Sequence, residues 1–373
     1  MNAMLPTLSI FIPVYRESDL LKPLLERLLD DPYEKKEIFV VIDEPTEKSF
    51  SIVREFSDCV YFICNGERKG KANVLNELVD KSHGEILLFL DSDCRIDEES
   101  KDFLRRIADE IKDADIVEMK KEVIRDSFVA RIVSYDYLSF NLTNLLFSHN
   151  LKKCLGLNGA AFAIRREAFN KLGGFRRVIL EDVDLATRAF MEGLSYKFLK
   201  DVSISTKAPS SWRKWFEQRK RWGIGSALWL KEYLRDIVRI VKEYPEVLLP
   251  SLLMVFPTLP FFLFTVFVPD DLYVKGLYIF MILLSTQVSL FLPPTAFTST
   301  SIVFVKNLSF MIGSLGAYSA FFYVVARKIG FVFNPAEFIF FYIIYSPLWL
   351  LIIIASIVKI YADMKNVNLN WKI

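Results

Sequence analysis

The chain has 373 residues, with 47 Lys and Arg against 45 Asp and Glu and a formal net charge of +2. This balance creates no bulk positive field, so we expect no nucleic-acid partner. The two His residues are too few for a His-rich metal cage, and the four Cys include no Cys-x-x-Cys pair. We therefore expect free thiols in a reducing compartment.

The first 120 or so residues alternate short apolar runs with amphipathic stretches. The expected strands are Leu8–Val14, Glu37–Asp43, Val60–Cys64, Ile86–Asp91 and Asp115–Met119, and the expected helices are Ser18–Leu29, Glu47–Phe56, Lys71–Ser82 and Glu98–Ile111. This alternation predicts an α/β domain, a parallel sheet with helices on both faces. Ligands of such sheets bind beyond the carboxyl ends of the strands.

Acidic side chains stand at three of those strand ends. The first strand ends in the run Pro13 to Glu17, the second in Asp43 and Glu44, and the fourth in Asp91-Ser92-Asp93. Each cluster alone is equally compatible with a helix N-cap. Three clusters at one edge would repel one another and require a cation. Carboxylate oxygens suit Mg²⁺ or Mn²⁺, which in turn hold phosphate oxygens.

Four further segments each have a functional and a structural interpretation. The turn Arg68 to Lys71 precedes a helix and fits a phosphate site or a basic surface turn. The small residues from Gly156 to Phe162 allow close approach of a ligand or tight packing. Glu181-Asp182 opens a helix, as its cap or as a general base toward an acceptor hydroxyl. Gln218 to Trp222 fits a site or contact with lipid headgroups.

The end of the chain is markedly apolar, because residues 247–373 carry only eleven charged side chains. We predict a transmembrane domain over residues 246–373, of about four helices, each near the length that a bilayer needs. The predicted spans are Val247–Val268, Gly276–Leu292, Asn307–Ala326 and Phe338–Val358.

The stretch before the first span mixes Leu and Ile at helical spacing with many Lys and Arg. It predicts an amphipathic interfacial helix at residues 226–245, in contact with anionic membrane lipids. Asn141–Asn150 fits a second membrane-touching helix or a soluble core helix. The apolar spans predict an integral membrane protein. Because no signal peptide is visible, we expect its N-terminal domain, residues 1–225, to face the cytoplasm.

Taken in order, these motifs resemble the membrane-embedded branch of glycosyltransferase family 2, which includes cellulose, hyaluronan and chitin synthases and ceramide glucosyltransferase. The similar segments are Ile12 to Glu17, Val41 to Glu44, Lys71 to Asn76, Asp91-Ser92-Asp93 as the DxD motif, Leu180-Glu181-Asp182 as the TED motif, and Gln218 to Trp222 as Q-x-x-R-W. Leu180 departs from the Thr of the TED motif.

The resemblance implies a GT-A, Rossmann-like nucleotide-sugar domain and a metal-dependent hexosyltransferase that inverts the sugar. The implied donor site comprises Pro13, Tyr15, Glu17, Asp43, Lys71, Asp91, Gln218, Arg221 and Trp222. Asp91 and Asp93 would bind Mg²⁺ or Mn²⁺, Asp182 would be the base, and Glu181 would support it. A UDP-linked sugar is the expected donor, and a lipid, lipid-linked glycan or growing polysaccharide is the expected acceptor.

Two alternatives stay open. A polyprenol-phosphate sugar transferase would use a phosphate as nucleophile and would need no strong base, but Q-x-x-R-W and the acidic pair argue against it. A membrane transporter with a nucleotide-sensing domain would normally carry charged residues inside its spans. The four predicted spans contain none.

Overall fold

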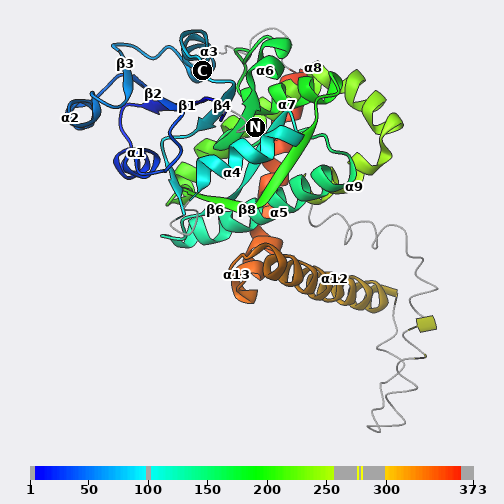
Figure 1. Cartoon of the computed structure of the whole chain (residues 1–373). Coiled ribbons are helices and arrows are strands. Elements are labelled where there is room, and N and C mark those ends of the chain that lie inside the picture. Colours follow the sequence, from blue (N-terminus) through cyan, green and yellow to red (C-terminus); the bar gives the residue numbers. More distant parts are fainter. Residues whose placement is uncertain (1–4, 98–101, 256–274, 277–278, 280–298, 363–373) are drawn as a thin grey trace. The chain divides into compact units, whose positions relative to one another are not determined.

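The structure is a computed structural model that describes residues 5–97, 102–255, 275–276, 279 and 299–362 (Figure 1). The chain divides into two compact units. The first comprises Met1–Ser251 together with Trp349–Ile373, and the second comprises Leu252–Leu348.

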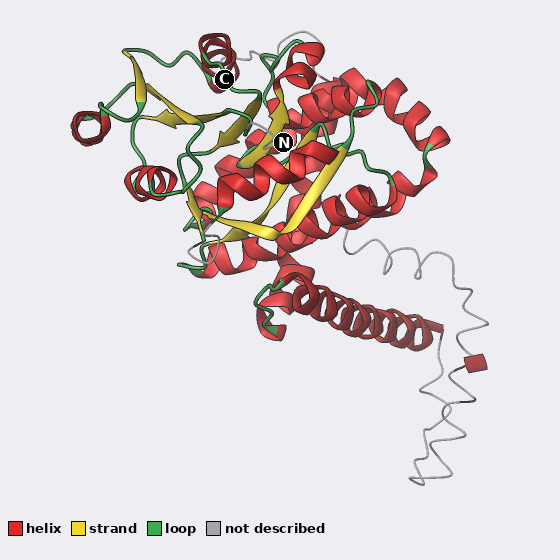
Figure 2. Ribbon diagram, viewed as in Figure 1, coloured by secondary structure: helices red, strands yellow, loops and turns green. Residues whose placement is uncertain are grey.

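The first unit is built on one mixed sheet. Its eight strands have the order β3-β2-β1-β4-β7-β6-β8-β5. Their bounds are β1 Leu8–Tyr15, β2 Lys36–Asp43, β3 Tyr61–Asn65, β4 Ile86–Leu90, β5 Cys94–Ile96, β6 Ile116–Val123, β7 Ala161–Arg165 and β8 Tyr196–Thr206. Figure 2 shows helices on both sides of this sheet, which confirms the predicted α/β class.

The five strands expected from the sequence are β1, β2, β3, β4 and β6. Neighbouring pairs among β1 to β4 are parallel, and β7 is antiparallel to both β4 and β6. The five predicted strands therefore share one direction, and the sheet is mixed only because β7 and β5 run the other way. The expectation of a purely parallel sheet was wrong, because these two strands run antiparallel to their neighbours.

The helices of the first unit follow the strands along the chain. Their bounds are α1 Leu21–Leu29, α2 Glu47–Phe56, α3 Lys71–Lys81, α4 Phe103–Glu110, α5 Phe128–Asn150, α6 Arg166–Leu172, α7 Glu181–Met191 and α8 Trp212–Glu243, with α9 at Leu248–Val255. Helix α5 is a core helix over most of its length, because Asn141, Leu142, Thr143, Asn144 and Phe147 are buried. Helix α8 runs unbroken across residue 225.

Two apolar cores lie on the sheet, because successive side chains of a strand point to opposite faces. Ile10 and Ile12 belong to one core and Phe11 to the other. In the second core Phe11 stacks on Phe39 of β2 and on Phe89 of β4, with ring centroids 5.6 and 5.2 Å apart. This row of aromatic side chains holds the central strands in register and so aligns their carboxyl ends.

Among the described residues, the remaining helices are α12 Ser299–Ile329, α13 Pro335–Phe340 and α14 Ser346–Ala362, and a π-helical segment, η4 Phe341–Tyr345, joins the last two. Lys306–Ile329 and Pro335–Ala362 are long and apolar enough to cross a membrane by length and composition, and they agree with the third and fourth predicted spans. Most of the first predicted span, and all of the second except Gly276 and Ile279, lie outside the described residues.

Candidate active site

The strand ends that the sequence singles out meet at one edge of the sheet. In the β1–β2 pair Tyr15 lies opposite Asp43, and in the β1–β4 pair Phe11 lies opposite Phe89. Asp91 follows β4 directly, and its N–H donates to the Ala160 carbonyl at 2.9 Å. The three acidic clusters are therefore brought to the same edge, as predicted.

Asp43 organises the loop after β3. Its Oδ1 accepts from Asn65 Nδ2 at 2.9 Å, and its Oδ2 accepts from the N–H groups of Lys69 and Gly70 at 2.9 and 3.2 Å. Gly70 has φ +89 and ends this loop as the N-cap of α3. Asp43, which we predict to bind the nucleoside, thus fixes the turn that precedes α3 and places Lys71 at the start of that helix.

The nucleoside end of the site is more exposed. The Tyr15 hydroxyl donates to Glu44 Oε2 at 3.0 Å, and the Arg68 guanidinium lies 4.6 Å from the centre of the Tyr15 ring. The Thr46 hydroxyl donates to Glu17 Oε2 at 2.6 Å. Pro13 lies two residues before the end of β1, opposite Val41. Tyr15 and Glu17 are thus exposed side chains at the strand end that the sequence predicts.

Two residues at this edge have a backbone conformation that L-residues rarely adopt. Arg16 has φ +64 and Glu44 has φ +52. Such strain costs on the order of 1–3 kcal/mol and is concentrated at functional sites. Its presence at the ends of β1 and β2, directly after Tyr15 and Asp43, supports the choice of this edge.

Lys71 joins the metal motif to the TED motif. Its Nζ donates to Asp91 Oδ1 at 2.7 Å and lies 3.3 Å from Glu181 Oε1. Burial disfavours the ammonium charge, but the carboxylates of Asp91, Glu181 and Asp182 outweigh it and hold the pKa of Lys71 well above its usual value. The ammonium is therefore a fixed positive charge among three acids.

Asp93 completes the acidic pair of the metal motif. Burial, and next the charge of Asp91, raise the pKa of the Asp93 carboxyl to about 6, although the charge of Lys71 and, less strongly, a hydrogen bond with Thr206 oppose the rise. Burial likewise raises the pKa of Glu181, with Lys71 opposing. The Lys71 ammonium thus offsets only part of the cost of burying these carboxylates in their charged form, and a divalent cation would offset more of it.

Asp91 and Asp93 would supply only part of the ligands that such a cation needs. Asp91 and Asp93 offer the hard oxygen ligands that Mg²⁺ and Mn²⁺ prefer. Within the described ranges no group of three or more His, Cys, Asp or Glu side chains is placed to hold a metal ion. The two aspartates fit a metal that keeps water or substrate oxygens in its other positions.

Asp182 is held by two backbone donors. Its Oδ2 accepts from the Gly159 N–H at 2.7 Å, and its Oδ1 accepts from the Val183 N–H at 2.9 Å. A Cβ on Gly159 would lie 2.9 Å from Asp182 Oδ2, so glycine permits this approach. The run of small residues thus packs tightly against the predicted base, and the carboxylate keeps lone pairs for a further proton donor.

The Q-x-x-R-W segment lies in the first turns of α8. Gln218, Arg221, Trp222 and Gly225 are spaced i, i+3, i+4 and i+7, which puts them on one side of the helix. Gly225 packs against the residue before Glu181, because a Cβ there would lie 2.7 Å from Leu180 Cγ. Farther along α8, the Trp229 indole N–H donates to Thr187 of α7 at 2.9 Å. This side of α8 therefore faces α7.

Gln218 and Trp222 are half-buried, whereas Arg221 is exposed. The buried cation of the motif is the neighbouring Arg219, which sequence reasoning missed. Arg219 Nη2 lies 2.8 Å from Asp136 Oδ2 of α5. The sequence gives no local signal for this difference, because residues 219–221 are three consecutive basic side chains and only the phase of the helix distinguishes them.

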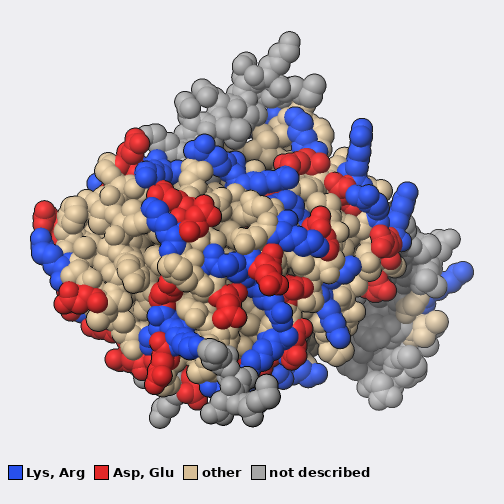
Figure 3. Space-filling view, turned by 45° about the horizontal axis from the view of Figure 1, so that its top comes forward, with Lys and Arg blue, Asp and Glu red and all other residues tan. Residues whose placement is uncertain are grey.

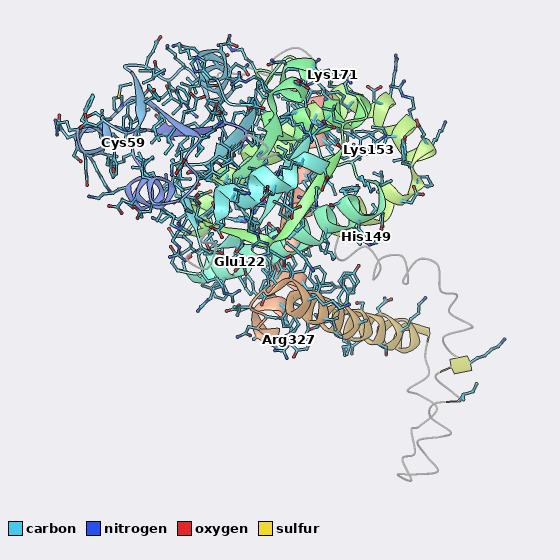
Figure 4. All side chains as sticks on the ribbon, in the orientation of Figure 1. Cys59, Glu122, His149, Lys153, Lys171 and Arg327 are labelled. Atoms are coloured by element: carbon cyan, nitrogen blue, oxygen red, sulfur yellow. The ribbon has the colours of Figure 1, made fainter. Side chains whose placement is uncertain are left out.

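Side chains that would suit other chemistries lie elsewhere. Ser9, Glu37 and His83 meet at the opposite edge, where β1 and β2 begin, and Ser9 Oγ donates to Glu37 and not to the imidazole. They lack the Ser–His bond of a hydrolytic triad. Cys59 and His149 are exposed, beside α2 and at the end of α5 (Figure 4). The face in Figure 3 carries acidic and basic side chains interspersed.

Comparisons with known proteins concern the family and the fold. Residues 9–173 match the model of Glycosyl transferase family 2. The chain is similar to Probable glycosyltransferase YdaM of Bacillus subtilis (strain 168), with 25% identity over 285 residues that cover 74% of this chain and 67% of that protein. It is 38% identical over 85 residues to Glucomannan 4-beta-mannosyltransferase 1 of Oryza sativa subsp. japonica, which covers 22% of this chain and only 16% of that protein.

The fold is similar to that of a solved mannosyltransferase from Pyrobaculum calidifontis, in complex with GDP-Man and Mn²⁺. The TM-score is 0.56 at 18% sequence identity, and the match covers 96% of this chain and 88% of that chain. At this identity the likeness concerns the fold, and it supports a GT-A domain followed by a helical C-terminal region.

Proposed function

We propose a reaction for this enzyme, whose residues 9–173 match the model of Glycosyl transferase family 2. It transfers a hexose, with inversion, from a nucleotide diphosphate sugar to a lipid, a lipid-linked glycan or a growing polysaccharide at the membrane surface. The observation that carries the proposal is the position of Lys71, whose ammonium contacts Asp91 of the metal motif and Glu181 of the TED motif. Donor and acceptor chemistry would thus share one polar network.

In this mechanism the acceptor hydroxyl gives its proton to Asp182 and attacks the anomeric carbon. The bond between that carbon and the diphosphate oxygen breaks on the opposite face, and the nucleotide diphosphate leaves. Lys71 and Arg221 would neutralise its developing charge, which is where electrostatic stabilisation contributes most. A divalent metal bound by Asp91 and Asp93 would act as a Lewis acid on the diphosphate.

The remaining predicted residues would bind the substrates. Tyr15, Glu17 and Pro13 would hold the nucleoside at the exposed strand end. Asp43 would act there through the loop that it fixes with Lys69 and Gly70. Gln218 and Trp222 would close the pocket on the acceptor side, since their side of α8 packs toward the residues before Glu181.

Two donors are candidates. Our sequence prediction is a UDP-linked sugar. GDP-mannose is a second candidate, because the Pyrobaculum calidifontis mannosyltransferase is in complex with GDP-Man and one short match is to a glucomannan 4-beta-mannosyltransferase. Mn²⁺ is present in the same solved complex, which favours Mn²⁺ over Mg²⁺ as the first metal to supply.

The membrane assignment is part of the proposal. The apolar side chains of the two candidate spans are largely unburied, with Ile312 59% and Leu351 62% exposed. A soluble core helix would bury such side chains, whereas a bilayer would cover them. On α8, Leu234 and Val238 are exposed among Arg235, Arg239 and Lys242, as expected of a helix on an anionic surface.

The proposal is tested by release of nucleotide diphosphate from the detergent-purified full chain. A panel of UDP- and GDP-sugars is supplied with Mn²⁺, with Mg²⁺ or with EDTA, in the presence of membrane lipids, and Asp182→Asn is the control. We expect turnover of one donor that is metal-dependent and falls by about 10²- to 10⁴-fold in Asp182→Asn. If polyprenol phosphate is the acceptor and Asp182→Asn stays active, the polyprenol-phosphate transferase replaces the proposal. No turnover of any donor refutes both.

A further inference from the structure

Arg219 is enclosed by side chains from three helices. Its side chain is buried, with a guanidinium nitrogen 2.8 Å from Asp136 Oδ2 of α5. The guanidinium carbon lies 4.2 Å from the ring centre of Trp222, one turn along α8, and 5.1 Å from that of Trp349 on α14. All of these residues belong to the first compact unit.

Burial of the Arg219 guanidinium requires an explanation, because removing a charge from water costs free energy that its partners must return. A planar guanidinium can bind a carboxylate at its edge while it stacks on aromatic rings with its faces. Arg219 makes both kinds of contact. The geometry restricts the Trp222 ring, because a cation close to one ring face favours a single orientation of the indole.

A chain of contacts also links the surroundings of Arg219 to Asp182, the predicted base. Tyr137 follows Asp136 on α5, and its hydroxyl hydrogen-bonds with Asn158. Asn158 precedes Gly159, whose N–H donates to Asp182 at 2.7 Å. Two adjacent residues of α5 therefore connect Arg219, on the side of Trp222, with the turn that holds Asp182.

Helix α14 approaches α8 at the next turn. A Cβ on Gly223 would lie 2.6 Å from Ser356 Oγ and 3.2 Å from Ile352 Cγ2. The other side of α14 leaves Leu351, Ile354 and Val358 exposed. The helix that brings Trp349 to Arg219 is thus one of the two candidate membrane helices.

We propose that Arg219 is a positioning residue for the acceptor, because its ion pair with Asp136 and its contacts with the rings of Trp222 and Trp349 set the orientation of Trp222. This inference rests on the proposed function, in which Trp222 frames the acceptor. Arg219 itself touches no reacting atom. Its removal should change the use of the acceptor and leave the use of the donor intact.

The test replaces both charges together. Arg219→Met with Asp136→Leu removes the pair and leaves no unpaired buried charge, and such apolar replacements are commonly tolerated. We expect a folded full-length protein whose KM for the acceptor rises about five- to tenfold, the size expected for loss of a cation–aromatic contact. The KM for the donor should stay within about twofold. Arg219→Lys, which keeps the charge and loses the planar fork, should give an intermediate KM.

A second readout does not depend on turnover. Acrylamide quenching of the Trp222 emission is isolated by subtracting the spectrum of Trp222→Phe in each background. We expect Trp222 to be shielded in the parent protein and more accessible in the Arg219→Met, Asp136→Leu variant. The matched control is Arg213→Met with Glu217→Leu, an exposed pair 3.4 Å apart on the same helix, which should change neither quantity.

Unchanged quenching together with an unchanged acceptor KM in the folded double variant would overturn the inference. A loss of thermal stability without the KM difference would also overturn it, because it would show a purely structural ion pair. Failure of the proposed function gives a different result, since the parent protein would then turn over no donor. In that case the quenching comparison alone still decides whether Arg219 orients Trp222.

Discussion

Substitution of Lys71 by methionine should affect metal binding and turnover in opposite directions. In the structure the Lys71 ammonium donates to Asp91 Oδ1 at 2.7 Å and lies 3.3 Å from Glu181 Oε1. It therefore occupies one of the two carboxylates that we assign to the metal. A cation that binds Asp91 before the donor arrives must displace this ammonium.

The size of the effect follows from the contact. Unit charges about 3 Å apart attract by roughly 5–6 kcal/mol at an effective dielectric constant of about 20, before desolvation is counted. The net value of a hydrogen bond between charged groups is about 1.5–3 kcal/mol. The side chains of Lys71 and Asp91 are 30% and 32% exposed, so we take the lower end, about 1.5 kcal/mol, because solvent screens part of the attraction.

Lys71→Met should therefore bind Mn²⁺ about tenfold more tightly than the parent in the absence of donor. Turnover should fall by about 10²- to 10³-fold, because the leaving diphosphate loses a fixed cation. The fall of the free-Mn²⁺ electron paramagnetic resonance signal on titration measures the first quantity, and nucleotide diphosphate release measures the second. Lys81→Met is the matched control, because Lys81 lies at the far end of α3 and pairs with Glu77 at 2.7 Å.

Equal or weaker Mn²⁺ binding by Lys71→Met would refute the reasoning, because it would show that the ammonium does not compete for Asp91. Tighter Mn²⁺ binding with normal turnover would separate the two roles. It would leave Lys71 as a competitor of the metal only and assign the leaving-group charge to other cations.

Three further predictions concern other parts of the chain. Gly159→Ala should lower kcat, because its Cβ would lie 2.9 Å from Asp182 Oδ2. Gly156→Ala, whose Cβ would have no atom within 4 Å, should leave kcat unchanged. Nucleotide diphosphate release measures kcat for both variants. Burial opposes ionisation of Glu37, but hydrogen bonds from Ser9, His83 and Gly84 hold its pKa below the ordinary value of 4.5. This carboxylate therefore stabilises the fold above pH 4.5 and loses that effect as the pH falls through its lowered pKa. Glu37→Gln should cost about 1 kcal/mol at pH 7, and the difference in unfolding free energy should close in acid; a constant difference would contradict the assignment. Leu234→Asp with Val238→Asp should reduce turnover in anionic vesicles but not in detergent, and equal losses in both would argue against a membrane contact of α8.

The candidate site was predictable where it depends on strand ends. Tyr15, Asp43 and Asp91 follow apolar runs, and parallel strands bring their carboxyl ends to one edge. The register of β1 with β2 and β4 confirms this arrangement. The assignment of substrate and metal roles to these residues stays a prediction.

The contacts between distant segments were not predictable from local patterns. Lys71 meets Glu181, 110 positions later in the sequence, and no spacing rule relates the two. The run Arg219-Lys220-Arg221 is uniformly basic, yet only Arg219 is buried. Its burial depends on Asp136 and Trp349, which come from other helices. Strand β7 was missed for a related reason, since its small residues acquire strand geometry only between β4 and β6.

The hydropathy of helix α14 predicts that it lies in a bilayer, but it does not predict which residues the helix packs against. Its apolar composition predicts a bilayer span, and the exposed Leu351 and Val358 agree with that. Its other side packs Ile360 with Ile179, Ile224 and Ala227, and Gly223 is the residue that lets the two helices approach. A fragment that ends at residue 225 or 245 would leave these side chains uncovered, although it would contain every acidic residue of the site. The segment Trp349–Ala362 is therefore part of the framework that holds the Q-x-x-R-W helix. Acceptor use should depend on it even though it contributes no acid, base or metal ligand.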